Sequence, residues 1–223
     1  MPLAHFIDHT LLKPTATLGE IEKLCNEASE NAFYSVCIPP YFVQDACQIV
    51  KGGSVKVATV IGFPFGYNHT KVKVTELKRA ISDGADEADM VMNLAAFKSN
   101  DIAYIENEIR QISKITAESN VVLKLIIESG ILSEEEIIRC CDLFQHFPVD
   151  FLKTSTGYAE KGASIAAIEI MRRYLPKHIQ IKASGGIKTY QFAKQLIDAG
   201  ANRLGCSASI AIVSGEETEG LGY

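Results

Sequence analysis

The 223-residue sequence predicts an α/β fold, a (β/α)8 barrel in a single domain that spans residues 1–223. Three observations support this prediction. Short apolar, β-branched segments alternate with longer segments of helical period, the alternation occurs about eight times, and no linker rich in Pro, Gly or Ser divides the chain. An open doubly wound sheet is the alternative, but it does not need eight repeats, and no G-x-G-x-x-G motif follows an early strand.

The first predicted unit is a strand at residues 6–10 followed by a helix at residues 17–31. Thr17 is a typical N-cap residue, and Glu20 completes a capping box three positions later. The apolar stripe of this helix is Ile21, Leu24, Cys25 and Ala28. This spacing indicates a helix that packs one face against a sheet.

The other units repeat this pattern in order along the chain. The predicted strands are 34–38, 55–63, 87–93, 121–129, 149–155, 179–186 and 203–207. The predicted helices that follow them are about 41–50, then 71–84, 101–119, 133–147, 163–175 and 189–200, with a short closing segment at the end. The eighth unit completes the number that closes a barrel of this class.

Composition narrows the classes of function. Hydrophobic residues make up 47% of the chain and charged residues 22%, as in ordinary globular proteins. The net charge is −5 and no basic stripe is present, so neither nucleic acid nor a membrane is the expected partner. No secretory signal pattern opens the sequence, and the six cysteines lack a C-x-x-C pair. We therefore expect a cytoplasmic protein with reduced, mostly buried thiols.

Polar residues interrupt or end the predicted strands, where a barrel of this class carries its active site. They are Asp8, Cys37, Asp89, Lys124, Glu128, Lys153, Lys182 and Ser184. Any single buried lysine could be half of a core ion pair or reach the surface with its amine. Three lysines and an aspartate at equivalent heights are costly to bury together, and this favours a functional cavity.

The lysines indicate a particular chemistry. A lysine amine attacks a carbonyl only when it is neutral, and with a reference pKa of about 10.4 only about one amine in a few thousand is neutral at pH 7. A second ammonium nearby and a partly desolvated pocket favour the neutral form. Lys153 and Lys182 end consecutive predicted strands, so we expect them to form such a pair.

Four motifs in order resemble the deoxyribose-phosphate aldolase family over nearly the whole chain: "FIDHTLLKP", "GADEADMVMN", "DFLKTSTG" and "IKASGGIKT". The resemblance implies a class I, Schiff-base aldolase of deoxyribose catabolism that reversibly cleaves 2-deoxy-D-ribose 5-phosphate to acetaldehyde and D-glyceraldehyde 3-phosphate. It also implies that neither a metal nor an organic cofactor is needed. Relatives are often dimers, so a homodimer is expected.

The resemblance assigns three catalytic residues. Lys153 forms the imine, Lys182 tunes it and shares in proton transfer, and Asp89 is the acid/base residue. A supporting set consists of Asp8, Thr10, Cys37, Lys124 and Tyr223. For Cys37 the alternative is a small buried hydrophobic residue, and for Tyr223 it is a disordered terminus.

The phosphate of such a substrate is expected at the loops after the seventh and eighth strands. The candidate residues there and in the loop after Lys153 are Gly157, Gly185, Gly186, Gly205 and Ser207. The alternative is that these glycines merely turn the chain. Some relatives have a lysine directly after "TSTG", whereas this chain has Tyr158 and reaches Lys161 later, which puts direct charge pairing from that loop in doubt.

Three alternatives stay open at this level. The five histidines show no H-E-x-x-H pattern, which disfavours a metal-dependent aldolase. A transaldolase-like Schiff-base enzyme would act on other sugar phosphates. A catalytically inactive barrel would bind a sugar phosphate without forming an adduct, although a binding protein has little reason to keep the pair Lys153 and Lys182.

Overall fold

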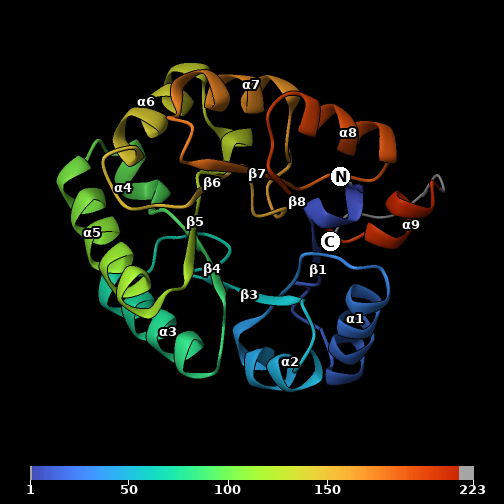
Figure 1. Ribbon diagram of the computed structural model, residues 1–223. Coiled ribbons are helices and arrows are strands. Elements are labelled where there is room, and N and C mark those ends of the chain that lie inside the picture. Colours follow the sequence, from blue (N-terminus) through green and yellow to red (C-terminus); the bar gives the residue numbers. More distant parts are fainter. Residues whose placement is uncertain (1, 216–223) are drawn as a thin grey trace.

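The computed structural model describes residues 2–215 of the chain. Eight parallel strands pair in sequence order and close into a barrel, with helices around the outside (Figure 1). The strands are β1 (Ile7–Thr10), β2 (Ser35–Ile38), β3 (Lys56–Ile61), β4 (Glu87–Val91), β5 (Val122–Ile126), β6 (Phe151–Lys153), β7 (Gln180–Ser184) and β8 (Arg203–Cys206). The predicted (β/α)8 barrel is therefore confirmed.

The helices follow the strands as the sequence predicts, with two differences. They are α1 (Leu18–Glu30), α2 (Val43–Ile49), α3 (Thr70–Ser82), α4 (Leu94–Lys98), α5 (Ile102–Ser119), α6 (Glu134–Phe144), α7 (Ile165–Tyr174), α8 (Tyr190–Asp198) and α9 (Ser209–Ser214), with 3-10 turns η1 (Leu3–Phe6), η2 (Pro40–Phe42) and η3 (Ser129–Ile131). The second helix begins later than predicted because the turn η2, which Pro39 caps and Pro40 opens, comes first. The fourth unit has an extra short helix, α4, before α5.

Helix α1 illustrates how local sequence sets the element boundaries. Thr17 has an extended backbone, and its capping box with Glu20 is present. Glu20 also accepts a hydrogen bond from the Thr17 main-chain N–H at 3.0 Å. The buried face of the helix is the predicted stripe of Ile21, Leu24, Cys25 and Ala28. The sequence pattern therefore fixes both the start of α1 and the face that it presents to the barrel.

The two faces of the barrel differ in chemistry. Ala88 and Met90 of β4 belong to the large apolar cluster between strands and helices, whereas Glu87 and Asp89 lie on the other face, in the barrel interior. A smaller apolar cluster around Cys37 and Val60 contacts Phe63. All six cysteines are free thiols, and Cys47 is half-buried while the others are buried. Among residues 2–215, no helix has the length and apolar character needed to cross a bilayer.

Candidate active site

Strand register brings the predicted catalytic residues together. Asp89 of β4 lies opposite Lys124 of β5, and Lys153 of β6 lies opposite Lys182 of β7. Lys182 in turn lies opposite Arg203 of β8. Since side chains alternate along each strand, these residues point into the barrel from neighbouring strands.

Asp89 is the centre of the cluster and is fully buried. Its Oδ1 accepts a hydrogen bond from the Lys124 amine at 2.8 Å. Its Oδ2 accepts from Lys153 at 2.7 Å and from Lys182 at 2.8 Å. One carboxylate therefore holds three lysine side chains at hydrogen-bond distance, and all three of the predicted catalytic residues meet there.

A second layer lies beneath Asp89, toward the start of the strands. Asp8 of β1 forms ion pairs with Lys182 and, at 2.7 Å, with Arg203. Glu87 pairs with Lys124 at 2.5 Å and with Arg203 at 3.3 Å. The Arg203 guanidinium also lies 3.4 Å from the centre of the Tyr34 ring. These contacts give Asp8, Glu87 and Asp89 at least two cationic partners each.

These ion pairs favour the charged forms of the lysines and carboxylates in the cluster. Burial opposes charge on Lys182, but Asp8 and Asp89 outweigh it and hold the pKa of Lys182 well above its ordinary value. Burial is likewise outweighed at Asp89, where Lys124, Lys153 and Lys182 hold the pKa well below the usual range of an aspartate. The pKa of Lys124 is raised, because Asp89 and Glu87 outweigh its burial.

The directly paired groups carry one positive charge in excess when all are ionised. The carboxylates are Asp8, Glu87 and Asp89, and the cations are Lys124, Lys153, Lys182 and Arg203. The cluster can therefore release one proton without leaving a buried carboxylate unpaired. Lys153 touches one carboxylate in this cluster, whereas Lys124, Lys182 and Arg203 each touch two. A neutral amine at Lys153 thus breaks the fewest ion pairs.

The hydroxyl-rich segment after Lys153 ties neighbouring loops together. Thr154 donates a hydrogen bond to the Ser184 carbonyl at 3.1 Å, and the Ser184 hydroxyl donates to the Ser155 carbonyl at 2.6 Å. The Thr156 hydroxyl donates to Glu128 at 2.5 Å. Burial raises the pKa of Glu128, although the bonds from Thr156 and the charge of Lys153 oppose this shift. The segment thereby fixes the end of β6 and the position of Lys153.

The predicted phosphate residues fall into two groups. Gly157, Gly185 and Gly186 have positive φ values of 93°, 87° and 75° in the loops after β6 and β7. A Cβ on Gly185 would lie 3.4 Å from the Gly157 Cα, so these two loops approach closely. Ser207 is exposed in the loop after β8.

Gly205 has a different local reason for being glycine. A Cβ there would lie 2.9 Å from the Ser184 Cβ and 3.1 Å from the Lys182 Cε. Gly205 therefore leaves the space that the Lys182 side chain occupies inside the barrel. Its contact with a phosphate stays a prediction.

The other supporting residues differ in whether they contact the charged cluster. The Cys37 Sγ lies 4.0 Å from the Asp89 carboxylate, and burial raises the pKa of this thiol. The Thr10 hydroxyl donates to the Asp8 carbonyl at 2.9 Å and so acts on the backbone of its own strand. Tyr223 lies outside the described residues.

Tyr158 helps to form an apolar cavity of about 420 Å³. Its hydroxyl donates to the Leu12 carbonyl at 3.0 Å, and its ring packs edge-on against Phe63 with centroids 5.5 Å apart. Val60, which lines this cavity, belongs to the same small cluster as Cys37. The cavity thus adjoins the side of the cluster where Cys37 faces Asp89.

Two residues of the charged cluster were missed at the sequence level. Glu87 stands two positions before Asp89, and Arg203 stands two positions before Gly205. A spacing of two places both residues of each pair on the same face of a strand. Following this alternation down each strand from the predicted catalytic layer would have found them.

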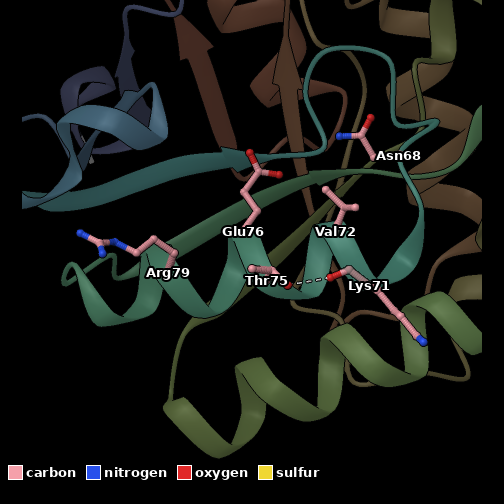
Figure 2. Close-up of a pocket in the computed structure, with 6 residues that line it drawn as sticks. All are labelled: Asn68, Lys71, Val72, Thr75, Glu76 and Arg79. Carbon is pink, nitrogen blue, oxygen red and sulfur yellow. Dashed lines mark hydrogen bonds between the residues drawn. The ribbon is translucent and has the colours of Figure 1, made fainter.

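A second hollow is a groove of about 550 Å³ along α3, and it shares Glu76 with the cavity that Tyr158 lines (Figure 2). Figure 2 shows that Glu76 points from α3 toward β3, whereas Arg79 and Lys71 leave α3 on either side of it. Glu76 accepts a hydrogen bond from the Gly62 N–H at 2.7 Å, and Arg79 pairs with Asp83. Glu76 and Arg79 therefore serve local structure.

Comparison with known proteins places the chain in a family. It is 46% identical to the deoxyribose-phosphate aldolase of Thermococcus kodakarensis over 219 residues, which cover 97% of this chain and 98% of that protein. The structure is similar to that of QR15, an aldolase, with a TM-score of 0.90, 39% identity and coverage of 95% and 94% of the two chains. It is also similar to a tetrameric deoxyribose phosphate aldolase from Aeropyrum pernix, with a TM-score of 0.89, 30% identity and coverage of 95% and 89%. Residues 3–215 match the family described as DeoC/LacD family aldolase, so the chain belongs to that family.

Proposed function

We propose that this chain is a class I aldolase that reversibly cleaves 2-deoxy-D-ribose 5-phosphate to acetaldehyde and D-glyceraldehyde 3-phosphate. The observation that supports it most directly is the contact of Lys153 with Asp89 in a buried cluster that keeps Lys182 charged. The names of the relatives, which are deoxyribose-phosphate aldolases, agree with this substrate.

In the proposed mechanism, the neutral amine of Lys153 attacks C1 of the open-chain sugar, and water leaves to give an iminium ion. The iminium accepts the electron pair of the C2–C3 bond as that bond breaks, while the C3 hydroxyl loses its proton. D-glyceraldehyde 3-phosphate departs and an enamine remains on Lys153. Protonation of the enamine at C2 and hydrolysis of the resulting imine release acetaldehyde and restore the amine.

Asp89 and Lys182 are the groups that we propose move these protons, through a bound water. Asp89 Oδ2 lies 2.7 Å from the Lys153 amine, so it is near the atom where the iminium forms. Lys182 lies 2.8 Å from the same oxygen and keeps its proton in the resting cluster. It can therefore donate the proton that the enamine takes up at C2, while Asp89 accepts the C3 hydroxyl proton through the bound water and stabilises the cationic intermediate. Lys124 supports Asp89 from the opposite oxygen.

The phosphate is proposed to lie over the loops after β6, β7 and β8. Gly157, Gly185 and Gly186 let main-chain N–H groups approach an anion closely, and Ser207 offers an exposed hydroxyl. We further propose that the enzyme is cytoplasmic, assembles as a homodimer and does not bind nucleic acid. Light scattering of the purified protein measures the assembly directly.

The assay for this function supplies 2-deoxyribose 5-phosphate and measures both products. The proposal predicts acetaldehyde and glyceraldehyde 3-phosphate in equal amounts, with no dependence on added divalent metal. Keto-sugar phosphates serve as the control substrates. Cleavage of those sugars, but not of 2-deoxyribose 5-phosphate, would instead support a transaldolase-like enzyme.

A further inference from the structure

A second network of hydrogen-bonded polar side chains lies on the outer side of β1, directly behind Asp8. His9 is 3% exposed and is the neighbour of Asp8, but its ring points to the helix side of the barrel. The His9 Nε2 lies 2.8 Å from a Glu27 carboxylate oxygen on α1. The His9 Nδ1 lies 2.9 Å from the Ser209 hydroxyl at the start of α9. The ring also packs edge-on against Phe33, with centroids 5.2 Å apart.

Ser209 connects this hydrogen-bonded network to the end of β8. Its hydroxyl is fully buried and donates a hydrogen bond to the Cys206 carbonyl at 2.9 Å. Cys206 also lies opposite His9 in the pairing of β1 with β8. The two-residue segment Ser207–Ala208 is therefore tied at both ends, by strand pairing at Cys206 and by the contact between Ser209 and His9.

The segment held in this way carries Ser207, which the proposed function assigns to the substrate phosphate. Within residues 2–215, no hydrogen bond holds the Ser207 hydroxyl, so it is available to a ligand. A hydroxyl positions an anion well only when its backbone is fixed before the ligand arrives. The ring of His9 supplies a fixed partner, since both of its nitrogens contact an oxygen and its plane packs against Phe33.

We propose that His9 is a positioning residue for the substrate phosphate and acts through Ser209 to fix the loop that presents Ser207. This inference rests on the proposed function. It concerns the phosphate end of the substrate alone, because the His9 ring lies on the opposite face of β1 from Asp8 and the lysines. Loss of the link should weaken binding of the phosphorylated substrate and leave imine chemistry intact.

The test compares two substrates, 2-deoxyribose 5-phosphate and 2-deoxyribose, in the wild type and in Ser209→Ala. This variant removes one hydroxyl and keeps the strands and the lysine cluster. We expect KM for the phosphorylated sugar to rise about tenfold, the size of one lost hydrogen bond of good geometry. The kcat for that sugar and the kcat/KM for 2-deoxyribose should stay within about twofold. His9→Ala should show the same split.

Thr116→Val is the matched control. The Thr116 hydroxyl is buried and donates to the carbonyl three residues earlier at 3.1 Å, as Ser209 does, but it lies on α5. Thermal unfolding shows how much stability each variant loses. We expect Thr116→Val to lose about as much stability as Ser209→Ala but to leave KM for both sugars unchanged. The higher KM of Ser209→Ala for the phosphorylated sugar would then come from the loop that carries Ser207 and not from a general loss of stability.

Two results with Ser209→Ala would overturn the inference. One is an equal loss on both substrates in Ser209→Ala, and the other is no change in KM for the phosphorylated sugar. Wild-type enzyme that treats the two sugars alike would remove the phosphate site itself, and with it the inference. Alternatively, the wild type prefers the phosphorylated sugar while Ser209→Ala keeps the wild-type KM for it. That result would overturn the role of His9 alone and leave the proposed function standing.

Discussion

Two fully buried lysines of this chain show opposite electrostatic behaviour. Lys73 lies outside the barrel, where α3 meets α5, and its amine contacts one carboxylate, Glu108, at 2.9 Å. Lys182 lies inside the barrel and contacts two carboxylates, Asp8 and Asp89. Burial lowers the pKa of Lys73 despite Glu108, whereas for Lys182 the two carboxylates outweigh burial and raise the pKa. Burial penalises both lysines, and the two carboxylates in direct contact outweigh it at Lys182, whereas the charges of Glu108 and Glu76 do not outweigh it at Lys73.

This difference indicates that the pair of Lys73 and Glu108 is structural, whereas the cluster around Lys182 serves catalysis. Lys73 donates a second hydrogen bond to the Val91 carbonyl at 2.8 Å and so ties the end of β4 to the helix layer. Burial raises the pKa of its partner Glu108, although Lys73 opposes this. Both members of the outer pair are therefore pushed toward their neutral forms. The inner cluster instead holds fixed charges around the Lys153 amine, and this is what a Schiff-base mechanism requires.

The strongest test of this contrast is Lys153→Leu. We expect kcat to fall by about 10⁴-fold or more, as when a nucleophile is removed from other enzymes. The fold should survive, because the substitution removes the cation in excess and leaves Asp89 paired with Lys124 and Lys182. Steady-state kinetics and thermal unfolding measure the two effects. A Lys153→Leu variant that kept measurable turnover would contradict the assignment.

Lys182→Met should damage both activity and stability. We expect kcat to fall about 10²- to 10⁴-fold, the range for a group that transfers protons. Stability should fall by about 3–5 kcal/mol, because Asp8 and Asp89 each lose a cation in a buried site. Urea unfolding and kinetics on the same preparation test both parts. Unchanged kcat would limit Lys182 to a structural role.

Lys73→Met is the matched change in the outer pair. It should also cost about 3–5 kcal/mol, since Glu108 is left buried without its cation. The value of kcat should stay within a few-fold, because Lys73 touches no member of the inner cluster in the described part of the chain. The double variant Lys73→Met/Glu108→Leu should regain most of the lost stability. Strict additivity of the two losses in urea unfolding would argue against a paired role.

Acid should weaken the inner cluster selectively. The folded-state pKa values of Asp8 and Asp89 are depressed, so their contribution is present above the unfolded pKa of about 3.9 and is lost as pH falls through lower values. Because the folded-state pKa of Glu108 is raised, its effect on stability has the opposite sign: acid favours the folded state at this residue, so Glu108 cannot cause the loss. The free energy of unfolding, measured in urea between pH 6 and pH 3, should therefore drop below about pH 4. The same drop is expected in Lys73→Met/Glu108→Leu, and its absence there would place the acid-labile charges in the outer pair.

The sequence predicted the barrel and its central residues because both follow from strand periodicity. Apolar strands alternating with amphipathic helices indicated the eight units, and Lys153, Lys182 and Asp89 stood out as polar residues at strand ends. Glu87 and Arg203 were missed because they lie in the layer beneath. The sequence could not show how many carboxylates each buried amine would meet, and that count depends on strand register.

Other features depend on tertiary contacts that leave no local pattern. Lys73 and Glu108 look like ordinary polar residues of amphipathic helices, yet both are fully buried when α3 packs on α5. His9 gave no metal motif, and its partners Glu27 and Ser209 stand 18 and 200 positions away. The contact between His9 and Ser209 follows from barrel closure between β1 and β8.

Borohydride trapping tests the central claim most directly. The protein is incubated with 2-deoxyribose 5-phosphate and borohydride, and peptide mass mapping then locates the reduced adduct. We expect one adduct on Lys153, none on Lys182, whose amine is held charged by Asp8 and Asp89, and none in Lys153→Leu. An adduct on Lys182, or no adduct although the sugar phosphate demonstrably binds, would contradict the account.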